Sequence, residues 1–463
     1  MTASKRQRPH VILIVSDDHG YADRSALGID PAVHTPHLDR LAAEGVSCTQ
    51  AYVTAPICSP SRAGLIAGQY QQRWGARWFD SSSFADHLPS LAERFADEGY
   101  ATGYFGKVHY GREDVGDRAC PPHHGFAETF YGLAGKSVGR LHYLRHTRRA
   151  VEEYGDAAVP MAVQPMLEGD EEVELEGFLT AELGRRAREF VAAHADTDEP
   201  FFCVLAFNAV HNFTWQLPPE ELERRGLRKY DDWDPSLSSY VDWYDGSISP
   251  HLPDGRAYYL AQLELMDAEI GALLHELDRR GIADDTIVVY TTDNGGSTCN
   301  FGVNTPLRGT KYTVYEGGIR VPYLVRWPGG GVSGGRSFDG LVSTLDLYPT
   351  LLSAAGASEE AYAHSDGIDQ LPGLRGESAT GHDTLHWDCG FQWAVRDAEW
   401  KLAYIEEGPH AEALRKGEHV TMESGLRLTN LRDDLGETTD RAAERPDVVE
   451  RLRRCRAKWL TTL

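Results

Sequence analysis

Two uninterrupted apolar segments constrain the fold of this chain more than any other feature of its sequence. They are HVILIVS at residues 10–16 and TIVVYTT at residues 286–292, both rich in β-branched side chains. Continuous apolar runs of this length fit β-strands that are buried on both faces of a sheet. Strand and helix patterns alternate from residue 10 to about residue 355, which favours an α/β fold. We therefore expect a large mixed, mostly parallel sheet sandwiched by helices.

The remaining periodic segments complete this expectation. Helical periodicity is found in segments 37–46, 90–100, 178–195 and 259–281. The acidic stretch 167–177 is expected to be a solvated loop. After about residue 375 the pattern changes to short strands near 385–390, 392–397 and 400–405, followed by a helix from Pro446. These signals predict a smaller C-terminal antiparallel sheet that packs with a helix.

Polar residues follow directly after both apolar segments. Asp17 and Asp18 come after the first, and Asp293 and Asn294 come after the second. Sites in open α/β sheets form beyond the carboxyl ends of the strands, so these four side chains are expected to meet. Such a set of oxygen ligands suits Ca²⁺ or Mg²⁺. The alternative is that the first pair caps a helix and that the second belongs to a turn.

The stretch C-S-P-S-R at residues 58–62 begins a short helical pattern. A cysteine at a helix N-terminus lies where backbone N–H groups point outward and favour an anion. Arg62 adds a fixed positive charge beside Cys58. The alternative is a buried cysteine before an ordinary helix.

Basic and imidazole side chains follow other strand-like or glycine-rich segments. Lys107 and His109 end one strand pattern, His211 follows another, and Lys311 lies in a glycine-rich stretch. Each residue alone is more often structural. Together with the acidic pairs and Cys58 they describe a pocket that binds a tetrahedral anion on a divalent cation.

At this point the chain resembles the type I, formylglycine-dependent sulfatases of the alkaline-phosphatase-like superfamily. The matching motifs are C-S-P-S-R at 58–62, G-Y-A-T-G-Y-F-G-K-V-H at 99–109, D-D at 17–18, D-N-G-G at 293–296, L-R-G-T-K at 307–311 and Y-E-G-G-I-R-V-P at 315–322. The resemblance extends over nearly the whole chain. It implies a catalytic domain at residues 1–375 and a small α+β subdomain at residues 376–463.

The resemblance also implies a mechanism. A formylglycine-generating enzyme would oxidise Cys58 to formylglycine, whose hydrate is the nucleophile. Ca²⁺, with Mg²⁺ as the alternative, would be held by Asp17, Asp18, Asp293, Asn294 and the modified residue 58. Arg62 and Lys107 would fix the modified side chain, and Lys107, His211 and Lys311 would bind the sulfuryl oxygens. His211 or Lys311 would protonate the leaving alcohol, and His109 would remove the second hydroxyl proton.

The implied activity is hydrolysis of a sulfated sugar or of a small alkyl or aryl sulfate, with release of inorganic sulfate. A phosphonate monoester hydrolase or phosphodiesterase with the same core remains an alternative, as does a non-catalytic anion-binding relative. The long segment 215–255 and Trp387 are expected to influence which leaving group is accepted. Arg140 and the nearby arginines are expected to lie on a solvated surface.

Composition limits the partners and the compartment. The chain has 463 residues, 46 basic and 70 acidic, with a formal net charge of −24. No net positive field would attract a nucleic acid backbone, so nucleic acid is not an expected partner. The seven cysteines show no zinc or disulfide spacing. No secretory signal or membrane-spanning run is evident, which favours a cytoplasmic protein, although export after signal removal stays open.

Overall fold

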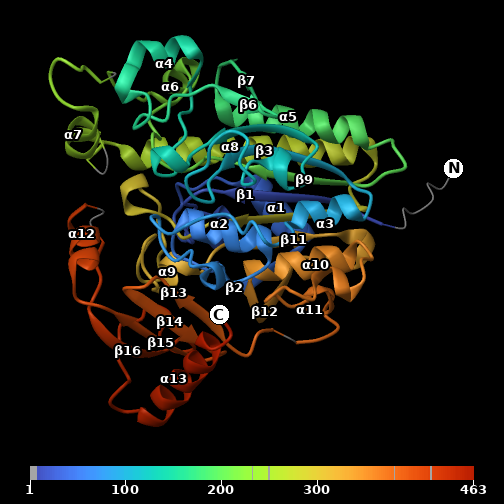
Figure 1. Cartoon of the computed structure of the whole chain (residues 1–463), viewed down its shortest axis with the longest axis vertical. Helices are drawn as coiled ribbons and strands as arrows, with labels where there is room; N and C mark the ends of the chain where they lie inside the picture. Colours follow the sequence, from blue (N-terminus) through green and yellow to red (C-terminus); the bar gives the residue numbers. More distant parts are fainter. Residues whose placement is uncertain (1–7, 232, 249–250, 380, 418–419) are drawn as a thin grey trace.

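The computed structural model describes residues 8–231, 233–248, 251–379, 381–417 and 420–463. Ten strands of these residues form one mixed sheet (Figure 1). From edge to edge they are β12 (Arg336–Ser343), β2 (Val46–Tyr52), β11 (Tyr323–Arg326), β10 (Thr286–Thr292), β1 (His10–Ser16), β9 (Phe201–Ala206), β3 (Ala101–Val108), β4 (Glu128–Leu133), β6 (Met166–Glu168) and β7 (Glu171–Val173). The central strands β10, β1, β9, β3 and β4 are all parallel.

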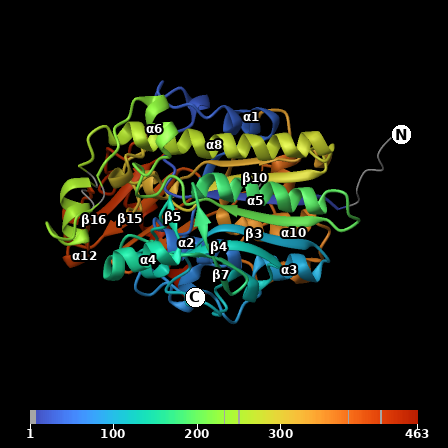
Figure 2. The ribbon, with the colours of Figure 1, turned by 90° about the horizontal axis from the view of Figure 1, so that it is seen from above.

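Helices cover both faces of this sheet (Figures 1 and 2). One face carries α1 (Pro36–Glu44), α5 (Leu179–His194) and α8 (Gly255–Arg280), and the other carries α2 (Cys58–Ala67), α3 (Leu91–Asp97) and α10 (Leu347–Ala354). Side chains of β1 alternate between the two layers, because successive residues of a strand point to opposite faces. Ile12 and Ile14 pack in the first layer, whereas Leu13 and Val15 pack in the second. This burial on both faces explains why the strand is apolar throughout.

A second, antiparallel sheet lies at the C-terminal end of the chain, with its final helix against it (Figure 1). It contains β13 (Leu385–Asp388), β14 (Gln392–Arg396), β15 (Trp400–Ile405) and β16 (Gly425–Asn430), and its helix is α13 (Pro446–Leu460). Val448 and Leu452 of α13 pack with Val395 and Leu402 of this sheet. The predicted fold class is therefore confirmed. Strand β16 was not predicted, because GLRLTN has only two apolar residues.

The remaining elements are short. They are the β5–β8 pair (Arg145–His146 and Leu175–Glu176) and helices α4 (Arg148–Tyr154), α6 (Pro219–Arg225), α7 (Tyr240–Trp243), α9 (Glu316–Ile319), α11 (Leu371–Arg375) and α12 (Pro409–Gly417).

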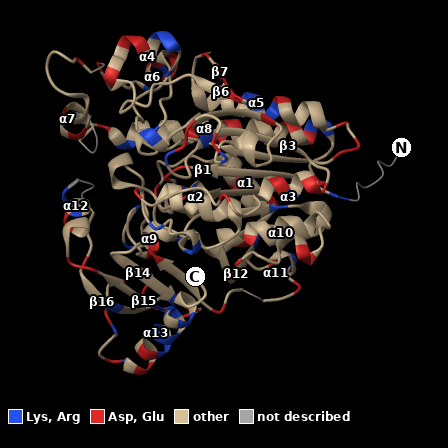
Figure 3. Cartoon of the chain, in the orientation of Figure 1, with Lys and Arg blue, Asp and Glu red and all other residues tan. Residues whose placement is uncertain are grey.

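Strands in Figure 3 are mainly uncharged, whereas acidic and basic residues mix along the outer helices. Within the described part of the chain, no helix is both long enough and apolar enough to cross a membrane.

The structure corrects the expected loop at residues 167–177. Residues Met166–Val173 form the β6–β7 hairpin, in which Leu167 pairs with Tyr131 of β4. The acidic side chains Glu171 and Glu172 are exposed, as the sequence indicated. Charged residues suit an edge strand because they oppose pairing with another chain. The acidic residues of this segment therefore suggested a loop where the chain forms the edge strand β7.

Candidate active site

The core of the site lies where β1 and β10 end side by side. The two strands are parallel and pair Ser16 with Thr292. The next residue of each strand is an aspartate, so this register places Asp17 and Asp293 at the same edge of the sheet. The backbone N–H of Asp18 donates to Asp293 Oδ1 at 3.3 Å. Strand pairing thus brings together Asp18 and Asp293, which are 275 residues apart in the sequence.

The carboxylate of Asp18 is held by two amide hydrogen bonds and one ion pair. Its backbone has a φ of 55°, a left-handed conformation that aspartate tolerates better than most residues. Asn294 Nδ2 donates to its Oδ1 at 2.7 Å, and Asn300 Nδ2 donates to its Oδ2 at 2.6 Å. The ammonium of Lys311 lies 2.8 Å from Oδ1. These contacts fix the carboxylate in one orientation.

Cys58 is the first residue of α2 and is 1% exposed. Its Sγ lies 3.7 Å from Asp17 Oδ1. Burial raises the pKa of the thiol well above its usual value, and Asp293 adds to this effect. Ligand atoms of Asp17, Asp18, Cys58 and His211 all lie within 4.8 Å of one another. The unmodified thiol is therefore a weak nucleophile within a group of side chains that could hold a metal ion.

Three buried cations balance the three buried aspartates. Lys107 pairs with Asp17, and Lys311 pairs with Asp18. Arg62 Nε lies 2.7 Å from Asp293 Oδ2, and its Nη2 lies 3.5 Å from Asp17. Isolated charges would be very costly at this depth, so the pairing is what allows the site to be buried.

The surroundings of Asp17 and Asp293 shift the pKa values of these two carboxyls in opposite directions. Burial, reinforced by Asp293, raises the pKa of Asp17 to about 7. Burial also acts on Asp293, but Arg62, Lys107 and Lys311 outweigh it and lower the pKa of that carboxyl. Asn294 Oδ1 is buried and has no hydrogen-bond partner among the described residues. A buried amide oxygen without a donor is the kind of atom that a cation satisfies.

Two histidines border the anionic cluster. His211 Nε2 lies 3.7 Å from Asp18 Oδ2, while His109 Nδ1 is buried without a hydrogen-bond partner in the described chain. Burial lowers the pKa of both imidazoles well below the usual value. Lys107 adds most to the effect at His109, and Lys311 adds most at His211. Both rings are therefore neutral near pH 7 and can accept a proton.

Comparisons with known proteins agree with this arrangement. The model of the family described as Sulfatase matches residues 9–357. The chain belongs to the sulfatase family. Arylsulfatase A of Bos taurus is 31% identical, covering 86% of this chain and 75% of its own length. A sulfatase of Formosa agariphila is 28% identical, covering 95% and 85%. The crystal structure of Ps i-CgsB with k-i-k-neocarrahexaose has a TM-score of 0.79 and 27% identity, covering 98% and 93%.

A narrow pocket of about 70 Å³ opens beside His211 in this sulfatase; we call it the catalytic pocket. It is lined by Phe79, Val138, Arg140, His211, Asn212, Tyr244, Asp245, Ser297, Cys299 and Tyr312. The Phe79 and Tyr312 rings lie 6.2 Å apart, and the Arg140 guanidinium lies 4.6 Å from the centre of the Tyr244 ring. The entrance therefore combines aromatic surfaces with the cation Arg140 and the carboxylate Asp245.

Arg140 does not lie on a solvated surface, so that expectation is wrong for this residue. It is half-buried at the entrance, whereas the side chain of Arg148 is 68% exposed. The loop turn at Val138 and Gly139, both with positive φ, brings Arg140 back towards the catalytic pocket. Asn300 was also missed, because it follows no strand or motif. Tyr244 and Asp245 bring segment 215–255 to the pocket beside His211, as expected, but the segment contains helices α6 and α7 and is not one long loop.

Trp387 does not approach the catalytic pocket. Its side chain is 1% exposed and packs in the core between the two sheets, with its ring 5.5 Å from that of Tyr52. Its indole N–H donates to the backbone oxygen of Val53 at 2.7 Å. The expectation that Trp387 selects the leaving group is therefore wrong, and the residue is structural.

Proposed function

We propose that this sulfatase releases inorganic sulfate from a sulfated sugar or a small aryl or alkyl sulfate, using formylglycine at position 58 and a divalent cation. One observation carries the proposal. Cys58 begins a helix and lies within 4.8 Å of ligand atoms of Asp17, Asp18 and His211. The thiol itself is held protonated, so chemistry at this position requires a different functional group.

The residues at the strand ends fit a hard divalent cation. Asp17, Asp18, Asp293 and Asn294 supply only oxygen ligands, and the amide oxygen of Asn294 lacks any donor in the described chain. This donor set favours Ca²⁺, with Mg²⁺ as the second choice. When bound, the cation would polarise a sulfate oxygen and lower the pKa of a coordinated hydroxyl.

The surrounding side chains then have separate tasks. Arg62 and Lys107 would orient the modified residue 58, and Lys311 would hold a sulfuryl oxygen by charge-assisted hydrogen bonding. Neutral His109 would accept a hydroxyl proton from residue 58. An anionic ester raises the pKa of a nearby imidazole, so His211 would gain a proton on substrate binding and deliver it to the leaving alcohol.

A saccharide leaving group is supported by the pocket entrance. Aromatic faces at Phe79 and Tyr312 suit a sugar ring, and Arg140 suits a further anionic substituent. The similar Ps i-CgsB was crystallised with k-i-k-neocarrahexaose. Relatives named arylsulfatase A and steryl-sulfatase are 31% and 28% identical to this chain, which keeps small aryl substrates in the proposal.

A parallel substrate assay tests the proposal. Wild-type enzyme should hydrolyse 4-nitrophenyl sulfate faster than a 4-nitrophenyl phosphonate monoester or bis(4-nitrophenyl) phosphate. Peptide mass spectrometry should find an aldehyde or its hydrate at residue 58. Cys58→Ala should lose turnover, whereas Cys455→Ala, a change on α13, should not. A preference for either phosphorus ester would support the alternative hydrolase, and full turnover with only an unmodified thiol would refute the proposed nucleophile.

A further inference from the structure

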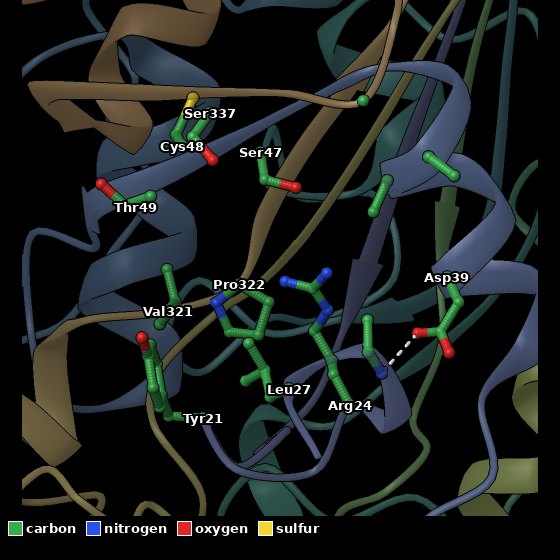
Figure 4. Close-up of a pocket in the computed structure, with 14 residues that line it drawn as sticks. Tyr21, Arg24, Leu27, Asp39, Ser47, Cys48, Thr49, Val321, Pro322 and Ser337 are labelled. Carbon is green, nitrogen blue, oxygen red and sulfur yellow. Dashed lines mark hydrogen bonds between the residues drawn. The ribbon is translucent and has the colours of Figure 1, made fainter. Parts of the chain in front are cut away.

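A second pocket lies between α1 and the edge of the large sheet (Figure 4). Its volume is about 360 Å³, within the range of small-molecule sites. It is lined by Tyr21, Arg24, Ala26, Leu27, Asp39, Ala42, Ala43, Ser47, Cys48, Thr49, Val321, Pro322, Gly335 and Ser337. We call it the Arg24 pocket. Its described lining residues are all different from those of the catalytic pocket.

Arg24 projects into the middle of this pocket, towards Ser47 and Pro322 (Figure 4). The residue is 8% exposed. Its Nε is buried without a hydrogen-bond partner, and its guanidinium forms no ion pair with any described residue. Burial lowers the pKa of Arg24 and the charge of Asp39 partly offsets this effect without forming an ion pair, and a guanidinium remains charged in proteins. The pocket thus contains a buried positive charge that the described chain leaves unpaired.

This arrangement is exceptional among the buried arginines of the described chain. Arg62 lies 2.7 Å from Asp293, Arg326 lies 2.7 Å from Glu44, and Arg320 donates to the backbone oxygen of Thr49 at 2.9 Å. Arg396 donates to Gln50 Oε1 at 2.8 Å. Each of these guanidinium groups has an acceptor, as burial of a charge requires. An acceptor for Arg24 therefore has to come from outside the described chain.

The nearby Asp39 does not serve as that acceptor. Its Oδ2 accepts from Ser25 Oγ at 2.6 Å, and its Oδ1 accepts from the backbone N–H of Ala26 at 3.0 Å. These bonds hold the carboxylate at the side of the pocket, whereas the guanidinium points away from it (Figure 4). A single acidic group at the wall also disfavours ligands with several negative charges.

The other walls define the rest of the ligand. Leu27, Val321 and Pro322 provide apolar surface, and Ser47 and Ser337 provide hydroxyl groups. Cys48 contributes no charge, because burial keeps its thiol protonated by raising its pKa. One cation, a few hydroxyl groups and an apolar wall suit a compact ring that carries one oxyanion group.

We propose that the Arg24 pocket binds a small organic monoanion, with its carboxylate or sulfonate-type head on Arg24 and its ring against Leu27 and Pro322. The guanidinium offers parallel N–H donors that match either head group. The net charge of −24 repels anions at long range, so binding depends on this local charge. The site is separate from the proposed sulfate ester chemistry.

Two bromine-labelled probes test the proposal, 4-bromobenzoate and 4-bromobenzenesulfonate, neither of which the enzyme can hydrolyse. Isothermal titration calorimetry on the full chain should show binding, and anomalous diffraction from soaked crystals should place bromine between α1 and β2. Arg24→Met should weaken binding at least tenfold, a loss of about 1.4 kcal/mol. Arg24→Lys should retain part of the affinity, because it keeps the charge but not the fork of donors. The relative affinity of the probes identifies the preferred head group.

Two controls separate ligand binding from folding. Arg24→Met removes an unpaired buried charge, so its Tm without ligand should equal or exceed that of the wild type, and ligand should no longer raise it. Its hydrolysis of 4-nitrophenyl sulfate should be unchanged. Ala43→Phe should block the pocket while leaving Arg24 in place.

Several results would overturn the proposal. These are no binding of either probe up to about 10 mM, equal binding by wild type and Arg24→Met, or bromine in the catalytic pocket alone. A large drop in the Tm of Arg24→Met would indicate a structural arginine. In that case the Ala43→Phe variant decides: if it binds the probes as tightly as the wild type, the probes do not bind in the Arg24 pocket.

Discussion

Lys401 of β15 and Glu316 of α9 form a buried ion pair between the two sheets, with Nζ 3.0 Å from Oε1. The same ammonium lies 2.8 Å from Glu437 Oε1. Tyr52 donates its hydroxyl to Glu316 Oε2 at 2.6 Å. Burial alone would raise the pKa of Glu316, but Lys401, Arg396 and Arg320 outweigh it and lower the pKa to about 2. The junction is therefore electrostatic as well as apolar.

We predict that Lys401→Met strongly destabilises the protein. The substitution keeps much of the side-chain volume but leaves Glu316 and Glu437 buried without their shared cation. Breaking a buried pair from one side costs about 3–5 kcal/mol. Urea unfolding at pH 7 measures the loss, and the exposed Lys458→Met is the matched control. A loss below about 1 kcal/mol, typical of an exposed pair, would show that the junction does not depend on this charge.

A second prediction concerns the pH dependence of stability through Glu113, which is 2% exposed. Its Oε1 accepts from the backbone N–H of Gly111 at 2.6 Å, but its Oε2 is buried without a partner in the described chain. Burial outweighs the backbone hydrogen bonds and raises the pKa from 4.5 to about 7. The stability contribution of the neutral form is full below pH 4.5 and is lost as pH rises through about 7.

Glu113→Gln should therefore stabilise the protein at high pH. At pH 8 we expect a gain on the order of 3 kcal/mol, because the pKa rises from 4.5 to about 7 and each pK unit corresponds to about 1.4 kcal/mol. At about pH 3.5, well below the ordinary value of 4.5, the gain should nearly vanish, since the wild-type carboxyl is then largely neutral in both states. Chemical denaturation at both pH values measures this, with exposed Glu171→Gln as the control. An equal effect at both pH values would contradict the raised pKa.

The sequence predicted the central site because local signals coincide there. The apolar runs before Asp17 and Asp293 mark parallel strands, and parallel strands bring their carboxyl ends together. Arg140 and Asn300 have no comparable signal. Arg140 reaches the site through an irregular loop and Asn300 at the end of a single 3-10 turn, Thr298–Asn300, and the course of such connections depends on tertiary packing rather than on a period in the sequence.

Burial explains the main error in the C-terminal part. Trp387 was placed near the pocket because strands of this region were expected to approach it. The four residues of β13 are all buried, and the indole of Trp387 fills the space beside Tyr52. Sequence periodicity predicts a strand, but it does not distinguish a side chain that faces a core from one that faces a ligand.

A third prediction concerns the metal. Adding Ca²⁺ should raise the Tm of the wild type, because a ligand that binds only the folded state stabilises it. Asn294→Leu removes the unpartnered amide oxygen, so its Tm should not respond and its bound metal, measured by elemental analysis, should fall. Asn430→Leu on β16 is the control for the same substitution far from the site. Retention of stoichiometric metal by Asn294→Leu after dialysis against a chelator would contradict the proposed ligand set.

The last prediction separates turnover from leaving-group selection. His211 lies 3.7 Å from Asp18 in the proposed reacting centre, so His211→Ala should lower turnover on every sulfate ester by about 10²-fold or more. Arg140 lies at the entrance, over the Tyr244 ring. Arg140→Ala should therefore lower kcat/KM at least about tenfold on a sulfated sugar with a second anionic group, since a charge-assisted contact is worth roughly 1.5–3 kcal/mol.

The matched measurement is kcat/KM on 4-nitrophenyl sulfate, which offers Arg140 no second anionic group. There Arg140→Ala should retain nearly full activity, and Arg148→Ala, with its exposed side chain, should be unaffected on both substrates. Trp387→Ala should instead lower stability by about 3–5 kcal/mol, because it empties a buried aromatic site. An equal loss on both substrates from Arg140→Ala would place this arginine at the sulfuryl group, whereas a sugar-specific loss from His211→Ala would move the histidine out of the reacting centre.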